Sequence, residues 1–123
     1  MSTKSFRDLI VWQKSKDLAV LIYKITEEFP KSETYGLVSQ MRRAAISISS
    51  NIAESYNRFH KKEKNQFLAI AYGSGSELES QIEIAKALFP TLDYEGSNVL
   101  LEAIMKILNK FLNFASQLPD SRF

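Results

Sequence analysis

Four long segments of heptad-spaced apolar residues, separated by short breaks, constrain this 123-residue chain more than any other feature. Within each segment the apolar side chains recur at alternating spacings of three and four residues, which places them on one stripe of an α-helix. Pro30 ends the first segment, and Pro90 and Pro119 bound the fourth, because proline cannot continue a helix. We predict helices over about residues 6–29, 33–58, 61–89 and 94–118.

The connections between these segments are short, and this predicts the topology. Short linkers near Pro30, Asn57 and Pro90 force sequential helices to be antiparallel neighbours. Glycine (4) and proline (3) are scarce, which disfavours architectures rich in turns. The expected fold is all-α: one domain, residues 1–123, forming an antiparallel up-down-up-down four-helix bundle.

Composition excludes several classes of chemistry. The chain has no cysteine, so disulfides, thiolate zinc sites and cysteine nucleophiles are excluded. The N-terminus lacks the apolar core of a signal peptide, and no apolar run approaches the roughly 18 residues that a membrane span needs. We therefore expect a cytoplasmic protein that does not enter a membrane.

Motifs that could carry catalysis or hold a metal are weak. His60 is the only histidine, and it stands among cations near a predicted turn. Glu77 and Glu79 lie about 200° apart around a helix, so they cannot share a metal. The run from Gly73 to Ser76 lacks the strand and the lysine of a phosphate-binding loop. We predict no catalytic residue, no metal and no cofactor, and hence a protein that is not an enzyme.

Two glycines interrupt the third predicted helix, although its heptad pattern continues through them. Each of Gly73 and Gly75 would cost about 1 kcal/mol relative to alanine in an exposed helix. We interpret them as points of close helix contact. The alternative is a real break that divides the segment into two shorter helices.

The first and fourth predicted helices carry more than one apolar stripe. Trp12 and Tyr23 flank the main stripe of the first helix, and Leu101, Leu108 and Ala115 flank that of the fourth. Surplus apolar width on a small bundle indicates a second buried surface, and therefore a homo-oligomer. The alternative is that these residues fill a wide core.

Polar residues form a second regular pattern on the two central helices. They are spaced by three and four on the second helix and on the third, and adjacent antiparallel helices would bring the two sets together as a ladder. We predict that Arg43 pairs with Glu77 or a nearby acid; the alternative is a solvated polar face. The ladder comprises Gln40, Arg43, Ser47, Ser50 and Glu54 on one helix and Ser74, Glu77 and Gln81 on the other.

Basic residues gather where the second predicted helix meets the third. Residues 42–64 hold six Lys or Arg against two Glu, a net charge of +4, whereas residues 77–102 carry a net charge of −5. Tyr56 and Phe59 add rings that can stack on unpaired bases. The alternative is an ordinary solvated turn. The candidate nucleic-acid-binding residues are Arg42, Arg43, Arg58, His60, Lys61, Lys62 and Lys64.

Three motifs, in order along the chain, resemble a bacterial four-helix-bundle family named for intervening sequences in 23S ribosomal RNA genes. They are FRDLIVWQK from Phe6, QMRRAAISISSNIAE from Gln40 and AYGSGSELESQ from Ala71. The chain is also similar to the accessory protein of diversity-generating retroelements. The resemblance implies a homopentameric ring, and the accessory protein implies binding to nucleic acid and a nucleoprotein partner.

The resemblance also implies roles for particular positions, none of them catalytic. The matching positions would be structural or interfacial: Trp12, Gln40, Arg42, Arg43, Asn51, Glu54, Gly73, Ser74, Glu77 and Glu79. The chain departs from the family's Gly-x-Gly-Arg at Ser55 to Arg58, which suggests a different end to the second helix. Together these observations predict a non-enzymatic oligomeric adaptor that contacts RNA or a nucleoprotein. The alternative is a structural or protein-binding homo-oligomer without affinity for nucleic acid.

Overall fold

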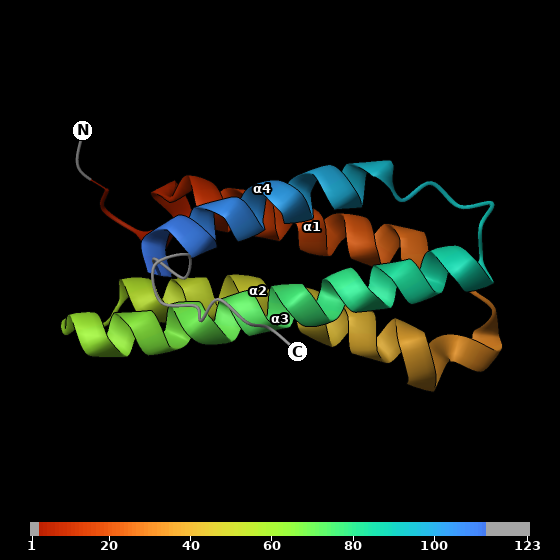
Figure 1. The fold of residues 1–123 in the computed structure, drawn as a ribbon, viewed down its shortest axis with the longest axis horizontal. Coiled ribbons are helices and arrows are strands. Elements are labelled where there is room, and N and C mark those ends of the chain that lie inside the picture. The colour runs from red at the N-terminus through yellow and green to blue at the C-terminus, as the bar shows by residue number, and fades with distance from the viewer. Residues whose placement is uncertain (1–2, 113–123) are drawn as a thin grey trace, which may run out of the picture.

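Four antiparallel helices form an up-down-up-down bundle in the computed structural model, which describes residues 3–112 (Figure 1). They are α1 (Ile10–Thr26), α2 (Ser39–Tyr56), α3 (Lys61–Leu88) and α4 (Glu95–Leu112). Each helix packs against the one before it, and α4 closes the bundle against α1. Residues 3–112 include no strand, and the predicted all-α four-helix bundle is confirmed.

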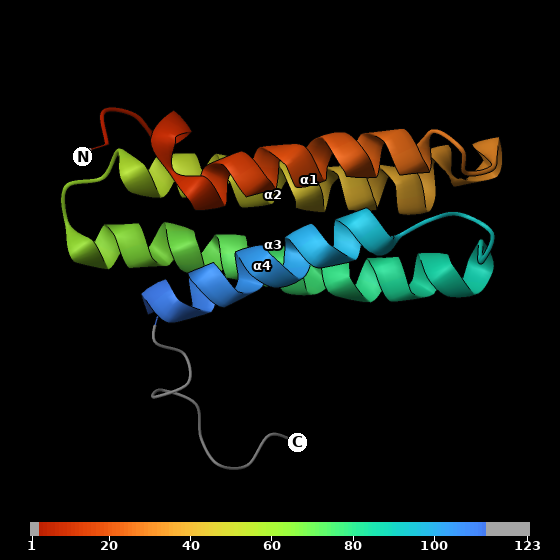
Figure 2. The same ribbon diagram turned by 90° about the horizontal axis from the view of Figure 1, so that it is seen from above.

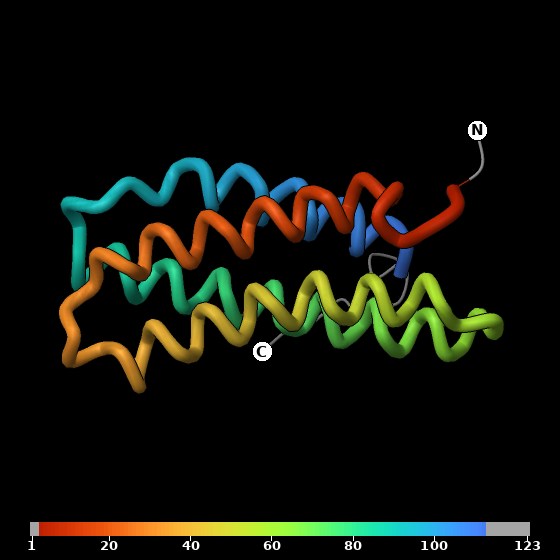
Figure 3. Tube along the Cα trace, turned by 180° about the vertical axis from the view of Figure 1, so that it is seen from behind, coloured from red at the N-terminus to blue at the C-terminus, as the bar shows by residue number. Residues whose placement is uncertain are grey.

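The bundle has four corners and two ends. Figure 1 shows α1 with α4 above α2 with α3, and Figure 2 shows α1 beside α2 and α3 beside α4. The α1–α2 and α3–α4 connections share one end, while the α2–α3 turn lies at the other (Figure 3). Residues on that turn are therefore separated from the other two connections by the length of the bundle.

The first helix is shorter than the predicted range of residues 6–29. Phe6–Asp8 form a 3-10 turn, and Leu9 is extended (φ −73°, ψ 127°), so the α-helix begins only at Ile10. At the other end the helix stops at Thr26, and the chain folds Phe29 into the core. There the ring of Phe29 lies 4.8 Å from that of Phe89, centroid to centroid, which couples the two connections at this end.

The second helix also begins later than the predicted residue 33. Lys31–Glu33 form a 3-10 turn and Thr34–Val38 a π-helical turn, in which Gly36 departs from helical angles (φ −105°, ψ −110°). The Glu33 carboxylate accepts a hydrogen bond from the Leu37 N–H at 3.2 Å. A regular α-helix then begins at Ser39 and ends at Tyr56, two residues before the predicted end.

The third helix runs unbroken through its two glycines, so the alternative of two shorter helices is wrong. Gly75 is buried, and a β-carbon there would collide with the sulfur of Met105 on α4. Gly73 is exposed, and a β-carbon there would meet no atom within 4 Å. The expected close contact is therefore found at Gly75 and not at Gly73.

The fourth helix is rotated relative to the predicted stripe. Leu101 and Leu108, expected to flank the main stripe, are 2% and 0% exposed, whereas Phe111, which the three-and-four spacing places in that stripe, is 52% exposed. Those two leucines fill the core instead of a second surface. The predicted end at residue 118, including Ala115, lies outside the described residues. The side chains that fill the centre of the bundle come from all four helices: Leu18, Ile22, Met41, Ile48, Ile52, Leu78, Ile82, Ile104 and Leu108.

Candidate nucleic-acid interface at the turn between α2 and α3

The turn between α2 and α3 spans only four residues, Asn57 to His60. Backbone hydrogen bonds from the Asn57 N–H to the Glu54 oxygen and from the Arg58 N–H to the Ser55 oxygen, both 3.2 Å, close the last turn of α2. His60 is extended (φ −93°, ψ 136°) and precedes the first turn of α3. The turn therefore displays its residues from a fixed backbone at one end of the bundle.

Two of the predicted binding residues at the turn are used within the protein. Arg58 Nη2 lies 2.6 Å from Glu54 Oε2, and its guanidinium stacks 4.8 Å from the Phe67 ring centroid. Lys64 Nζ donates to the carbonyl oxygens of Ser55 (3.2 Å) and Tyr56 (3.3 Å). Lys64 thus caps the C-terminus of α2, where a cation is favoured by the helix dipole.

The other candidate binding residues of the turn face solvent. His60, Lys61 and Lys62 are exposed, and Phe59 is 95% exposed. Within the described part of the chain, these side chains take part in no hydrogen bond or ion pair. Because the two lysines also stand at the positive end of the α3 dipole, the turn concentrates positive potential that can attract an anion.

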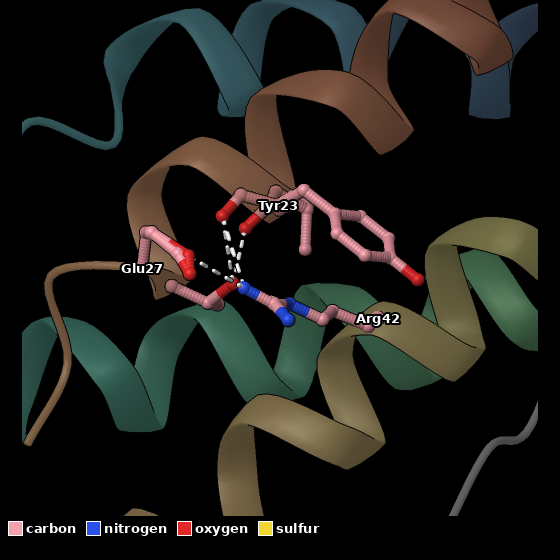
Figure 4. Close-up of polar contacts among 5 residues, drawn as sticks. Tyr23, Glu27 and Arg42 are labelled. Atoms are coloured by element: carbon pink, nitrogen blue, oxygen red, sulfur yellow. Dashed lines mark hydrogen bonds and ion pairs between the residues drawn. The ribbon is translucent and has the colours of Figure 1, made fainter. Parts of the chain in front are cut away.

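Arg42 lies far from this turn and holds α1 to α2 (Figure 4). Its Nε donates to Thr26 Oγ1 at 3.0 Å, and its Nη2 donates to the Tyr23 carbonyl oxygen at 3.2 Å. The same Nη2 lies 3.7 Å from Glu27 Oε2. The guanidinium therefore satisfies groups at the C-terminus of α1, a role that sequence reasoning missed because it depends on how the two helices approach.

Arg43, next to Arg42, is exposed. Both arginines, with Tyr23, Tyr35 and Ile46, line an open groove of ≈ 590 Å³ over α1 and α2. The ion pairs of the described residues do not include Arg43, so the predicted pairing with Glu77 or a nearby acid is not found there. The cations at Arg42 and Arg43 thus form no continuous surface with the turn.

The polar ladder exists only at its centre. Ser47 Oγ lies 2.8 Å from Ser74 Oγ, joining α2 to α3, and Asn51 Nδ2 donates to the Ser47 carbonyl oxygen at 2.8 Å. Glu54 pairs within its own helix, and Gln40 is exposed. Gln81 is buried, and its Oε1 has no hydrogen-bond partner among the described residues.

A groove between α3 and α4 is lined with acidic residues. A groove of ≈ 420 Å³ is lined by Glu79, Glu83, Asn98, Leu101 and Glu102 of α3 and α4. Partial burial removes water from the Glu79 carboxyl and raises its pKa above the ordinary value.

Over residues 3–112, no group of three His, Asp or Glu side chains is placed so that it could hold a metal ion. No helix in that range is long and apolar enough to cross a membrane.

Two comparisons with known proteins give matches. The model of the 23S rRNA-intervening sequence protein family matches residues 7–112. A crystal structure from Bacteroides thetaiotaomicron, of a protein with unknown function from the S23 ribosomal protein family, superposes with a TM-score of 0.74. It is 25% identical, and the match covers 84% of this chain and 98% of that one. No curated protein sequence matches significantly.

Proposed function

Because this chain belongs to the 23S rRNA-intervening sequence protein family, we propose that it is a non-enzymatic, self-associating adaptor that contacts RNA. The contact is made through the turn between α2 and α3, whether the RNA is free or part of a nucleoprotein. Resemblance to the accessory protein of diversity-generating retroelements makes a homopentameric ring the expected form. A ring would repeat the turn and multiply its field.

The observation that carries this proposal is the set of unpartnered groups at the turn. Lys61 and Lys62 are exposed cations at the start of α3, and Phe59 beside them is 95% exposed. Lysines supply phosphate contacts, and an exposed ring supplies a stacking platform for an unpaired base. Arg58 and Lys64 add positive charge to this end of the bundle, although each is already bonded within the protein.

The test is salt-dependent binding of a fluorescent single-stranded RNA of mixed sequence, followed by anisotropy. Replacing both lysines (Lys61→Glu/Lys62→Glu) removes two phosphate contacts. The plot of the logarithm of the binding constant against the logarithm of the salt concentration has a negative slope. Its magnitude should decrease by about 1.4, because each phosphate contact on a single strand contributes about 0.7. Phe59→Ala should weaken binding with little change in the slope, because stacking is not a charge contact.

A matched control carries the same change in net charge elsewhere. Lys24 and Lys110 are exposed on α1 and α4, so Lys24→Glu/Lys110→Glu tests a general effect of charge. Equal loss of RNA binding in both double variants would contradict a site at the turn. Absence of binding by the wild-type chain at low salt would favour the rival function, a structural homo-oligomer without affinity for RNA.

A further inference from the structure

The solvent side of α3 carries a second heptad pattern, independent of the one that faces the core. The residues are spaced alternately by four and three, and every one of them is exposed. Ile70 and Ile84 are 51% and 50% exposed, and Leu88, next along the helix, is 55% exposed. Exposed isoleucines that share one heptad register, separated by small and polar residues, give this face apolar points at which another helix can pack. The stripe comprises Gln66, Ile70, Gly73, Glu77, Ser80, Ile84 and Ala87.

The neighbouring helix α2 extends this face. Ser47 and Ser74 are joined at 2.8 Å, and the helices run antiparallel, so one turn in the same direction from this bond leads to Arg43 and to Glu77. Beside Arg43, Ile46 is 43% exposed. The outer face of α2 and α3 therefore combines exposed isoleucines with one cation and one carboxylate at the same level.

Arg43 and Glu77 stand close to the same contact and remain unpaired. Both residues are exposed, and within residues 3–112 neither side chain takes part in a hydrogen bond or ion pair. If the α2 side of this face on one copy meets the α3 side of the face on the next, Arg43 and Glu77 come together, and the contact can repeat around a ring. The two sides of the face are thus complementary in charge between copies.

Gly73 lies in the middle of this face, and no close packing within the protomer requires a glycine there. A β-carbon there would meet no atom within 4 Å, whereas one at Gly75 would collide with Met105. A glycine in an exposed helix interior costs about 1 kcal/mol relative to alanine. The cost is offset if the backbone at Gly73 is approached closely by a helix of another molecule.

We propose that the outer face of α2 and α3 joins copies of this chain, with Arg43 of one copy paired with Glu77 of the next. Gly73 admits the neighbouring helix, and Ile46, Ile70 and Ile84 supply the apolar contact. The stripe from residue 66 to residue 87 is about 32 Å long at 1.5 Å per residue. This inference rests on the self-association included in the proposed function, and it adds which surface of the protomer makes the contact.

Charge reversal tests the pairing, with sedimentation velocity as the readout over a range of protein concentrations. Arg43→Glu and Glu77→Lys should each raise the dissociation constant of the assembly at least tenfold. The double variant Arg43→Glu/Glu77→Lys exchanges the two charges within one chain and should restore assembly, because every contact between copies again pairs opposite charges. Lys24→Glu and Glu28→Lys, at exposed positions of α1 and its end, are the matched controls and should leave assembly unchanged.

Gly73→Leu tests the close approach independently of charge. The variant should keep its helical circular dichroism, because a β-carbon at residue 73 meets no atom within 4 Å and leucine is a good helix former. Its assembly should weaken at least tenfold. Gly73→Leu is thus informative even if a charge variant fails to fold.

The outcomes separate this inference from the proposed function. An assembly that survives Arg43→Glu, Glu77→Lys and Gly73→Leu overturns the assigned surface and leaves self-association standing. A wild-type chain that stays monomeric at all concentrations overturns both. Loss of RNA binding in the Lys61→Glu/Lys62→Glu variant with intact assembly supports the contact at the turn and leaves the assigned surface standing.

Discussion

The Arg42 guanidinium lies 4.4 Å from the ring centroid of Tyr23 and also donates to that residue's carbonyl oxygen at 3.2 Å. The Arg42 side chain is 26% exposed, so these contacts are partly shielded from water. A residue on α2 thus adds a charged donor to a carbonyl oxygen in the last turn of α1, which also accepts a hydrogen bond from the Glu27 N–H at 3.2 Å. Arg42 therefore contributes to the stability of the bundle.

Arg42→Ala should lower the free energy of unfolding by roughly 1–3 kcal/mol, because hydrogen bonds from a charged donor are lost. Urea denaturation at low protein concentration measures this without a contribution from assembly. Lys24→Ala, on the exposed side of the same turn, is the control and should have a much smaller effect. An Arg42→Ala variant as stable as the wild type would contradict the capping role.

The two glycines of α3 give a matched pair. Gly75→Ala should leave the fold about 1–3 kcal/mol less stable than Gly73→Ala does, because both changes gain helix propensity but the new methyl group at residue 75 displaces the Met105 side chain. Gly73→Ala meets open space and should stabilise the monomer by up to about 1 kcal/mol through helix propensity.

A double-mutant cycle checks the cause of the Gly75 effect. If Met105 is responsible, Gly75→Ala should cost less in a Met105→Ala background, because the sulfur is then absent. Equal costs in both backgrounds would show that the loss comes from elsewhere. Thermal unfolding followed by circular dichroism supplies all four values.

Heptad spacing was sufficient to predict the four helices, because a bundle of this size buries one stripe of each. It could not locate the helix ends. Leu9 and Gly36 leave helical angles although neither is a proline, and the capping of α1 by Arg42 depends on tertiary contact. Local pattern therefore identifies the elements, while long-range packing decides where they stop.

The rotation of α4 shows a second limit. Leu100, Ile107 and Phe111 fit a heptad as well as Leu101 and Leu108 do, so the pattern alone could not choose the buried side. The same limit applies at the candidate site. The sequence identified the basic turn, but only the structure separates exposed Lys61 and Lys62 from the engaged Arg58 and Lys64.

Tyr94 ties the connection before α4 to the end of α3. Its hydroxyl donates to the carbonyl oxygens of Ala85 (3.1 Å) and Phe89 (3.0 Å), and the residue is 6% exposed. Tyr94→Phe keeps the ring but leaves both carbonyls without this donor, so we expect a loss of roughly 1–2 kcal/mol. Tyr35→Phe, at a residue that is 96% exposed, is the control in urea denaturation and should be neutral.

Glu79 makes stability depend on pH. Burial raises the pKa of its carboxyl in the folded protein, so between the unfolded pKa of about 4.3 and the higher folded pKa the native state holds a proton that the unfolded state has lost. Stability therefore falls as pH rises through this window. Glu79→Gln removes the ionisable group, so at pH 7 it should be more stable than the wild type.

The dependence of stability on pH distinguishes the effect of burying the Glu79 carboxyl from a general effect of removing a negative charge. The advantage of Glu79→Gln should disappear below about pH 4, where the wild-type carboxyl is protonated in both states. Glu28→Gln removes the same charge at an exposed position near the end of α1 and should give no comparable gain at pH 7. Denaturation midpoints at pH 3.5, 5 and 7 measure both variants. A Glu79→Gln variant that is less stable than the wild type at pH 7 would show that the carboxylate is favoured by its surroundings, and the cause assigned to the shift would be wrong.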